Sequence, residues 1–146
     1  NEVGCMSILV SYYPGAYGPT LLIAPQSTQE LEAFERLLRD LADGNVGSRE
    51  LESHLDCNLD SLSSITLRRT GMGSSTRLVR TEVGPGRTRF DWSNTADGWR
   101  DCASRVQRLR ESNAAGHQYL SREGLDDALV ELSFRELTVQ PGPAES

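Results

Sequence analysis

The segment from Ser27 to Gly44 constrains the fold most strongly, because it predicts a helix with one apolar side. Ser27 and Glu30 have the spacing of a capping box, in which each side chain accepts a hydrogen bond from a backbone N–H at the start of the helix. Gly44 is placed to end the helix. The apolar residues that recur at helical spacing are Leu31, Phe34, Leu37, Leu38 and Leu41. Such a helix requires a second layer of structure that covers its apolar side.

A second amphipathic helix is expected after Ser93 or Asn94, either of which can cap it. Its apolar stripe is formed by Trp99, Cys102, Val106 and Leu109. Gly116 is placed to end this helix. His117 would then lie beside the C-terminal carbonyl groups of the helix, with which a histidine interacts favourably.

Strand patterns occupy much of the remaining chain. The segments that alternate, or that form short apolar runs, are 7–13, 20–24, 64–69, 76–83, 87–92 and 128–134. Turn residues separate the first two segments, and Gly84-Pro85-Gly86 separates the fourth and fifth, so each pair is expected to form a hairpin. We therefore predict an α+β fold, with a largely antiparallel sheet of about five or six strands and the two amphipathic helices packed on one face.

The segment 45–63 permits two interpretations. Leu51, Leu55, Leu59 and Leu62 recur at near-helical spacing, which is compatible with a short helix. Alternatively, residues 54–59 form a strand. No internal repeat or linker divides the chain, so we predict one domain over residues 1–139 and a flexible C-terminal tail over residues 140–146.

Cysteine usage indicates a reducing compartment. Cys5, Cys57 and Cys102 form an odd and scattered set, whereas secreted domains that depend on disulfides carry an even and denser one. No run approaches the roughly 18 apolar residues that a membrane helix needs. The first ten residues also lack the pattern of a secretion signal. We therefore expect a cytoplasmic location and no contact with a membrane.

Residues that carry catalysis or bind metal show no specific pattern. The closest local set of ligands is His54, Asp56 and Cys57, which lacks the paired spacing of a zinc site. A nucleophilic pair of Cys57 or Cys102 with His117 shows no local sign of activation. We therefore expect no metal, no cofactor and no enzymatic activity. The alternative is a small enzyme or ligand-binding domain whose site forms only in three dimensions.

Charge is unevenly distributed along the chain. The net charge of −6 argues against a general nucleic-acid-binding protein, which would be basic. Residues 27–60 contain nine acids and three arginines, whereas residues 65–110 contain ten arginines and four acids. The simplest interpretation is that these charges mix on the folded surface. If the acids gather on one face, they attract a basic partner. If the arginines gather on one exposed face, nucleic-acid binding becomes a third alternative.

Three tyrosines, Tyr12, Tyr13 and Tyr17, lie beside a turn rich in proline and glycine. Exposed tyrosines are favoured in protein interfaces, because they bury a large area at a low cost in conformational entropy. Tyr13 and Tyr17 are therefore candidate anchors for a partner. The alternative is that Tyr12 and Tyr17 cover one end of the core.

Several short motifs follow one another in the second half of the chain. They are Asp91-Trp92-Ser93, Trp99, an arginine-rich helix, Gly116-His117-Gln118-Tyr119-Leu120, and the acidic and apolar run from Asp126 to Glu136. This order resembles that of small immunity proteins from bacterial polymorphic-toxin and contact-dependent inhibition systems. The hairpin near the N-terminus and the helix over residues 27–43 resemble the same group, whereas residues 45–73 do not.

The resemblance implies a protein that is made beside a toxin and blocks it in the producing cell, often by covering its active site. Many such toxins are nucleases with basic clefts, which an acidic surface would complement. We therefore expect a cognate protein toxin as the partner and no direct contact with nucleic acid. The candidate toxin-binding residues are Glu50, Glu52, Asp56 and Asp60, with Tyr13 and Tyr17 as aromatic anchors.

Overall fold

The computed structural model describes residues 7–15, 18–60, 62–71, 77–112, 115–120 and 129–134, in which nine strands and three helices lie. The strands are β1 (Ile8–Gly15), β2 (Gly18–Ala24), β3 (Ser48–Glu50), β4 (Cys57–Asp60), β5 (Ser64–Arg69), β6 (Arg77–Gly84), β7 (Arg87–Asn94), β8 (Gly116–Tyr119) and β9 (Leu129–Phe134). The helices are α1 (Thr28–Asp43), α2 (Leu51–His54) and α3 (Ala96–Ser112). The α+β class expected from the sequence is confirmed.

The strands form two sheets, which we call sheet A and sheet B. Sheet A has five strands in the order β4-β1-β2-β9-β8, and sheet B has four in the order β3-β5-β7-β6. Both sheets are mixed, because β1 runs parallel to β4, β2 to β9 and β5 to β7. The strands expected in one largely antiparallel sheet are thus divided between two, since local alternation predicts a strand but not its neighbour.

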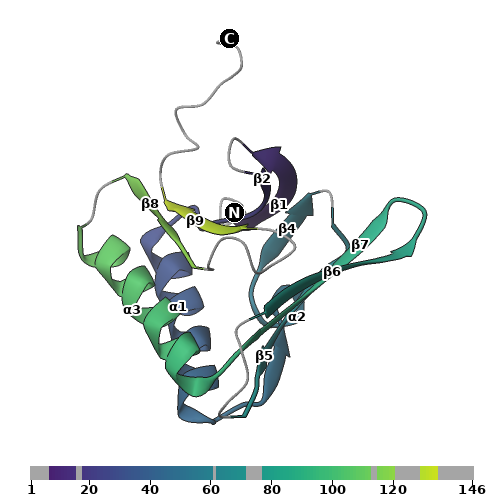
Figure 1. The fold of residues 1–146 in the computed structure, drawn as a ribbon. Coiled ribbons are helices and arrows are strands. Elements are labelled where there is room, and N and C mark those ends of the chain that lie inside the picture. Colours follow the sequence, from purple (N-terminus) through teal and green to yellow (C-terminus); the bar gives the residue numbers. More distant parts are fainter. Residues whose placement is uncertain are drawn as a thin grey trace.

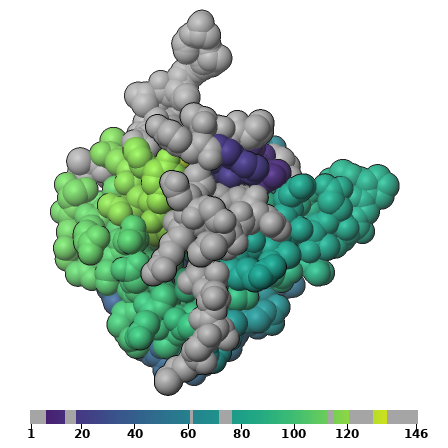
Figure 2. Space-filling view, viewed as in Figure 1, coloured from purple at the N-terminus to yellow at the C-terminus, as the bar shows by residue number. Residues whose placement is uncertain are grey.

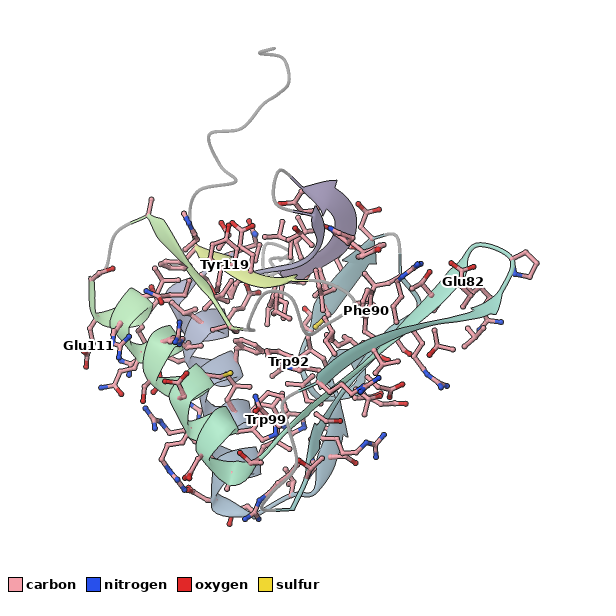
Figure 3. All side chains as sticks on the ribbon, viewed as in Figure 1. Glu82, Phe90, Trp92, Trp99, Glu111 and Tyr119 are labelled. Carbon is pink, nitrogen blue, oxygen red and sulfur yellow. The ribbon has the colours of Figure 1, made fainter. Side chains whose placement is uncertain are left out.

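The two long helices lie side by side on one flank of the molecule, with sheet A above them and sheet B on the opposite flank (Figure 1). Apolar side chains from both helices and both sheets form one continuous core. Its largest fully buried members include Trp92, Trp99, Phe34 and Phe90. The rings of Trp92 and Trp99 meet edge to face with their centroids 4.9 Å apart, in the space between α3 and sheet B (Figure 3). An edge-to-face pair of this kind adds to the stability gained from burial alone.

The capping box of α1 is confirmed. The amide of Glu30 donates to Ser27 Oγ at 3.1 Å, and the carboxylate of Glu30 accepts the amide of Gln26, one residue before the cap, at 2.7 Å. The helix ends at Gly44, whose φ of 81° lies in the left-handed region that a side chain would strain. All the apolar residues predicted for its buried side are buried.

The second helix differs from the sequence prediction at both ends. Its buried stripe contains the four predicted residues, but its N-terminal cap is Thr95, whose Oγ1 accepts the amide of Gly98 at 3.1 Å. Ser93 and Asn94 belong to β7 instead. Gly116 does not end the helix, because α3 ends at Ser112 and Gly116 begins β8. The short β8 lacks an apolar run of its own, so its strand pattern is weak.

The segment 45–63 contains parts of both interpretations. A single helical turn, α2, follows β3, and β4 follows α2 after two residues. Leu51 and Leu62 are buried, and Leu55 and Leu59 pack against the core from half-buried positions. The leucine spacing therefore reflects one side of a turn–strand unit, not one continuous helix. The predicted tail over residues 140–146 lies outside the described residues.

The β6–β7 hairpin extends away from the rest of the molecule, as the teal lobe of the space-filling view shows (Figure 2). Its turn depends on Gly86, which has a φ of 69°. Val83, near the turn, is 41% exposed. No helix in the described part of the chain is long and apolar enough to cross a membrane.

Candidate protein-binding site

The predicted acidic residues do not share one element of the fold. Glu50 ends β3 in sheet B, is exposed, and accepts a hydrogen bond from the hydroxyl of Ser53 at 2.8 Å. Glu52 lies on α2, is half-buried, and accepts the backbone amide of Ile65 at 3.1 Å. Its carboxylate thus ties α2 to the start of β5, which is a structural role.

Asp56 immediately precedes β4 and Asp60 is its last residue, and both are exposed. Asp60 pairs in register with Ser11 of β1, so the two side chains point to the same side of sheet A. Tyr13 lies two residues further along β1 and points to that side as well. Asp60 and Tyr13, predicted separately, are therefore diagonal neighbours. Tyr17 lies outside the described residues.

The Tyr13 side chain extends across β2 toward the carboxylate of Glu131, which no motif in the sequence marks as functional. Its hydroxyl donates to Glu131 Oε1 on β9 at 3.4 Å, a long and therefore weak hydrogen bond. The Tyr13 side chain stays 37% exposed. Partial burial, followed by the negative charge of Glu131, raises the pKa of the Tyr13 hydroxyl, so the group stays a protonated donor at neutral pH.

Two residues of β8 join the same side of sheet A. Tyr119 pairs in register with Glu131, and His117 lies two residues earlier on the strand. The rings of His117 and Tyr119 meet edge to face at 5.6 Å. Figure 3 labels Tyr119 at the sheet A end of the molecule, above the tryptophan pair. The alternation of His117 and Tyr119 about Gln118 was a weak strand signal that could have placed them on one side.

We call the group formed by Asp60, Tyr13, Glu131, His117 and Tyr119 the tyrosine–carboxylate face. It draws on four strands, β4, β1, β9 and β8, with β2 lying between β1 and β9. The buried run from Thr20 to Ala24 makes β2 a rigid centre for it. The face offers aromatic rings and carboxylates together, which suits contact with cationic and apolar groups of another protein.

The arginine-rich segment also gathers part of its charge on one face. Register places Arg68, Arg77 and Arg89 on the outer side of sheet B. Asp91 lies between two of them, 3.7 Å from Arg68 Nη2 and 3.4 Å from Arg89 Nε. The geometric condition for the nucleic-acid alternative is therefore met, but two of the three guanidinium groups already face a carboxylate.

The cysteines that the structure describes are shielded thiols. Burial is the main cause that raises the pKa of Cys57 and of Cys102 to about 12. Cys57 Sγ lies 3.8 Å from the carbonyl oxygen of Leu51, and Cys102 Sγ lies 3.4 Å from that of Leu120. His54 is exposed, and no group of three potential metal ligands occurs in the described ranges.

These thiols should therefore react slowly. A Cys5→Ser variant removes the one cysteine outside the described residues, so that any thiol reaction comes from Cys57 or Cys102. Because the thiolate is the nucleophile, reaction with an aromatic disulfide at pH 8 should be roughly a hundredfold slower in native than in urea-unfolded protein. The native rate should rise as the pH approaches the raised pKa. A native thiol that reacts at the unfolded rate would contradict this, and Cys57→Ser would identify it.

No protein-family model matches the chain, and no curated protein or solved structure matches it.

Proposed function

We propose that the protein is an immunity protein, which binds a cognate bacterial toxin domain and covers its active site. Under this proposal it acts in the cytoplasm of the producing cell and has no enzymatic activity of its own. The motif order around Gly116 to Leu120 suggested this function, and that motif supplies β8 with two residues of the tyrosine–carboxylate face.

One observation carries the proposal. Tyr13 and Val83 are the exposed large apolar residues in the described part of the chain. Of the two, Tyr13 lies between Asp60 on the neighbouring strand β4 and Glu131 on β9, beyond β2. Aromatic residues at the centre of a polar surface dominate the binding energy of many interfaces. Flanking carboxylates raise the association rate with a basic partner and disfavour an acidic one.

The location of the face supports inhibition by coverage. Its residues belong to strands of one sheet, with β2 between β1 and β9, so little backbone freedom is lost when they contact a partner. Asp60 and Glu131 lie on opposite sides of Tyr13. The two carboxylates therefore place negative charge around an aromatic ring, whose face itself attracts cations. Such a surface complements the basic, phosphate-binding cleft that a nuclease toxin would carry.

The first experiment co-expresses the protein with the C-terminal domain of a large secreted protein encoded beside its gene. We expect a stable one-to-one complex on size exclusion and growth of cells that the domain alone would kill. If cells die and no complex forms, the immunity proposal is wrong.

Within that complex, Tyr13→Ala should weaken binding about tenfold, because it removes the ring at the centre of the face. Val83→Ala is the matched control, since Val83 is equally exposed but lies on the distant hairpin. Asp60→Asn should chiefly lower the association rate and its dependence on salt. Surface plasmon resonance at two salt concentrations measures all three. Equal losses for Tyr13→Ala and Val83→Ala would show that the toxin binds elsewhere.

A further inference from the structure

A groove of about 320 Å³ runs along the solvent side of the seam between α1 and α3. It is lined by Glu32, Glu35, Arg36, Arg39 and Arg110. The two helices lie antiparallel there, since the first half of α1 faces the last turns of α3. The groove therefore combines side chains from segments that are far apart in the sequence.

Glu35 organises the groove. Its side chain is only 10% exposed, and each of its oxygens accepts one guanidinium N–H. Oε1 accepts Arg110 Nε at 2.7 Å, and Oε2 accepts Arg39 Nε at 3.1 Å. Arg39 Nη2 also donates to Gln107 Oε1 at 2.7 Å. Two arginines from different helices are thus held in fixed orientations by one buried carboxylate.

These bonds leave guanidinium N–H groups unused. A guanidinium carries five donors, of which Arg110 uses one and Arg39 two in the contacts above. Arg36 is exposed and forms no ion pair within the ranges that the structure describes. The hydrogen bond to Glu35 raises the pKa of Arg110, which stays fully charged at any physiological pH.

We propose that this groove binds an oxyanion, a phosphate group or a carboxylate, through Arg36, Arg39 and Arg110. Guanidinium groups match the geometry of such anions and bind them with two parallel hydrogen bonds. Because Glu35 fixes Arg39 and Arg110 before binding, less side-chain entropy is lost than in a cluster of free arginines. The site lies on the helical flank, on elements other than those of the tyrosine–carboxylate face, so it does not depend on the immunity function.

Glu32 limits the affinity of the site for anions. It is exposed on the same groove, and its negative charge opposes that of an incoming anion. Removal of this charge should tighten binding, whereas removal of the charge on Arg36 should weaken it. The two opposite signs distinguish a defined site from the general attraction of anions to a surface.

The test titrates the purified chain with inorganic phosphate and, separately, with acetate, at constant ionic strength. The probes are the ¹H–¹⁵N signals of the arginine Nε groups, of which those of Arg39 and Arg110 are fixed by Glu35. We expect saturable shifts of these two signals. Saturation by phosphate alone identifies a phosphate site, and saturation by acetate as well identifies a general carboxylate and phosphate site.

Variants of the lining residues and a control complete the test. Arg36→Gln should weaken binding about tenfold, and Glu32→Gln should tighten it about threefold. Arg108→Gln is the control, because Arg108 is an exposed arginine on α3 that does not line the groove. Linear shifts without saturation, or equal effects of Arg36→Gln and Arg108→Gln, would overturn the proposal. If Arg36→Gln disturbs the fold, Arg36→Lys serves instead. Lysine keeps the positive charge but lacks the two parallel N–H donors of a guanidinium, so this variant should bind phosphate more weakly than the native chain.

Discussion

Replacement of Trp99 with phenylalanine should lower the free energy of unfolding by about 3 kcal/mol. Two losses contribute. The smaller ring leaves a void beside Trp92 in a core where Trp99 is fully buried. The change also removes the indole N–H that donates to the carbonyl oxygen of Arg68 at 3.0 Å, and that oxygen then lacks this partner in a half-buried location.

The matched control is Trp92→Phe, which should cost only about 1 kcal/mol. Trp92 is equally buried, but its Nε1 has no hydrogen-bond partner among the described residues. The void is similar, whereas removal of an unsatisfied buried donor is favourable. Urea unfolding followed by far-ultraviolet circular dichroism measures both variants without reliance on tryptophan fluorescence. Equal losses would mean that the Trp99 hydrogen bond contributes nothing.

Replacement of Glu35 with alanine should destabilise the fold by about 2 kcal/mol. The carboxylate joins α1 to α3 through Arg110 and holds Arg39, so its loss leaves two guanidinium groups without their shared acceptor. Loss of one partner of a fully buried pair costs more, but these arginines are 28% and 38% exposed and can regain water. The change in unfolding midpoint should occur with an unchanged dependence on urea concentration.

Glu32→Ala is the control for this prediction, because Glu32 occupies the same helix but is exposed. It should change stability by less than about 0.5 kcal/mol. If Glu35→Ala and Glu32→Ala lowered the free energy of unfolding equally, the effect would come from helix propensity or general charge. The interhelical role of Glu35 would then be excluded.

Elements with local signals could be predicted from the sequence. The capping residues and Gly44 define α1 within one residue, because they act through hydrogen bonds to nearby backbone groups. The turn around Gly86 defines the β6–β7 hairpin for the same reason. The N-terminal hairpin follows from the turn that separates two apolar runs.

Elements that depend on distant contacts could not be predicted. β8 has no apolar run and becomes a strand only because β9 pairs with it. The parallel pairs leave no local trace, since neither β4 nor β9 carries information about its partner. Thr95 was not predicted as the cap because Ser93 and Asn94 rank above threonine as capping residues by type, and only the length of β7 excludes them.

In the candidate site, too, some residues could be predicted from local sequence and others depend on distant contacts. Tyr13 and Asp60 were identified by residue type and local composition, and parallel pairing of β1 with β4 brings them together. Glu131 and Tyr119 required the register of β9 against β2 and β8, which no local pattern supplies. Glu52 has the same residue type as the exposed acids, but its contact with Ile65 gives it a structural role that only the fold reveals.

The arrangement of sheet A also determines when this chain can finish folding. β2 follows β1 closely in the sequence and pairs with it soon after both are synthesised, but its other neighbour, β9, is the last strand that the structure describes. Until β9 leaves the ribosome, the apolar run of β2 presents an unpaired edge, which is prone to aggregate. Pairing between such distant segments is intrinsically slow. Because Glu131 arrives on that same strand, a nascent or truncated chain would lack part of the tyrosine–carboxylate face even if its N-terminal half were already folded.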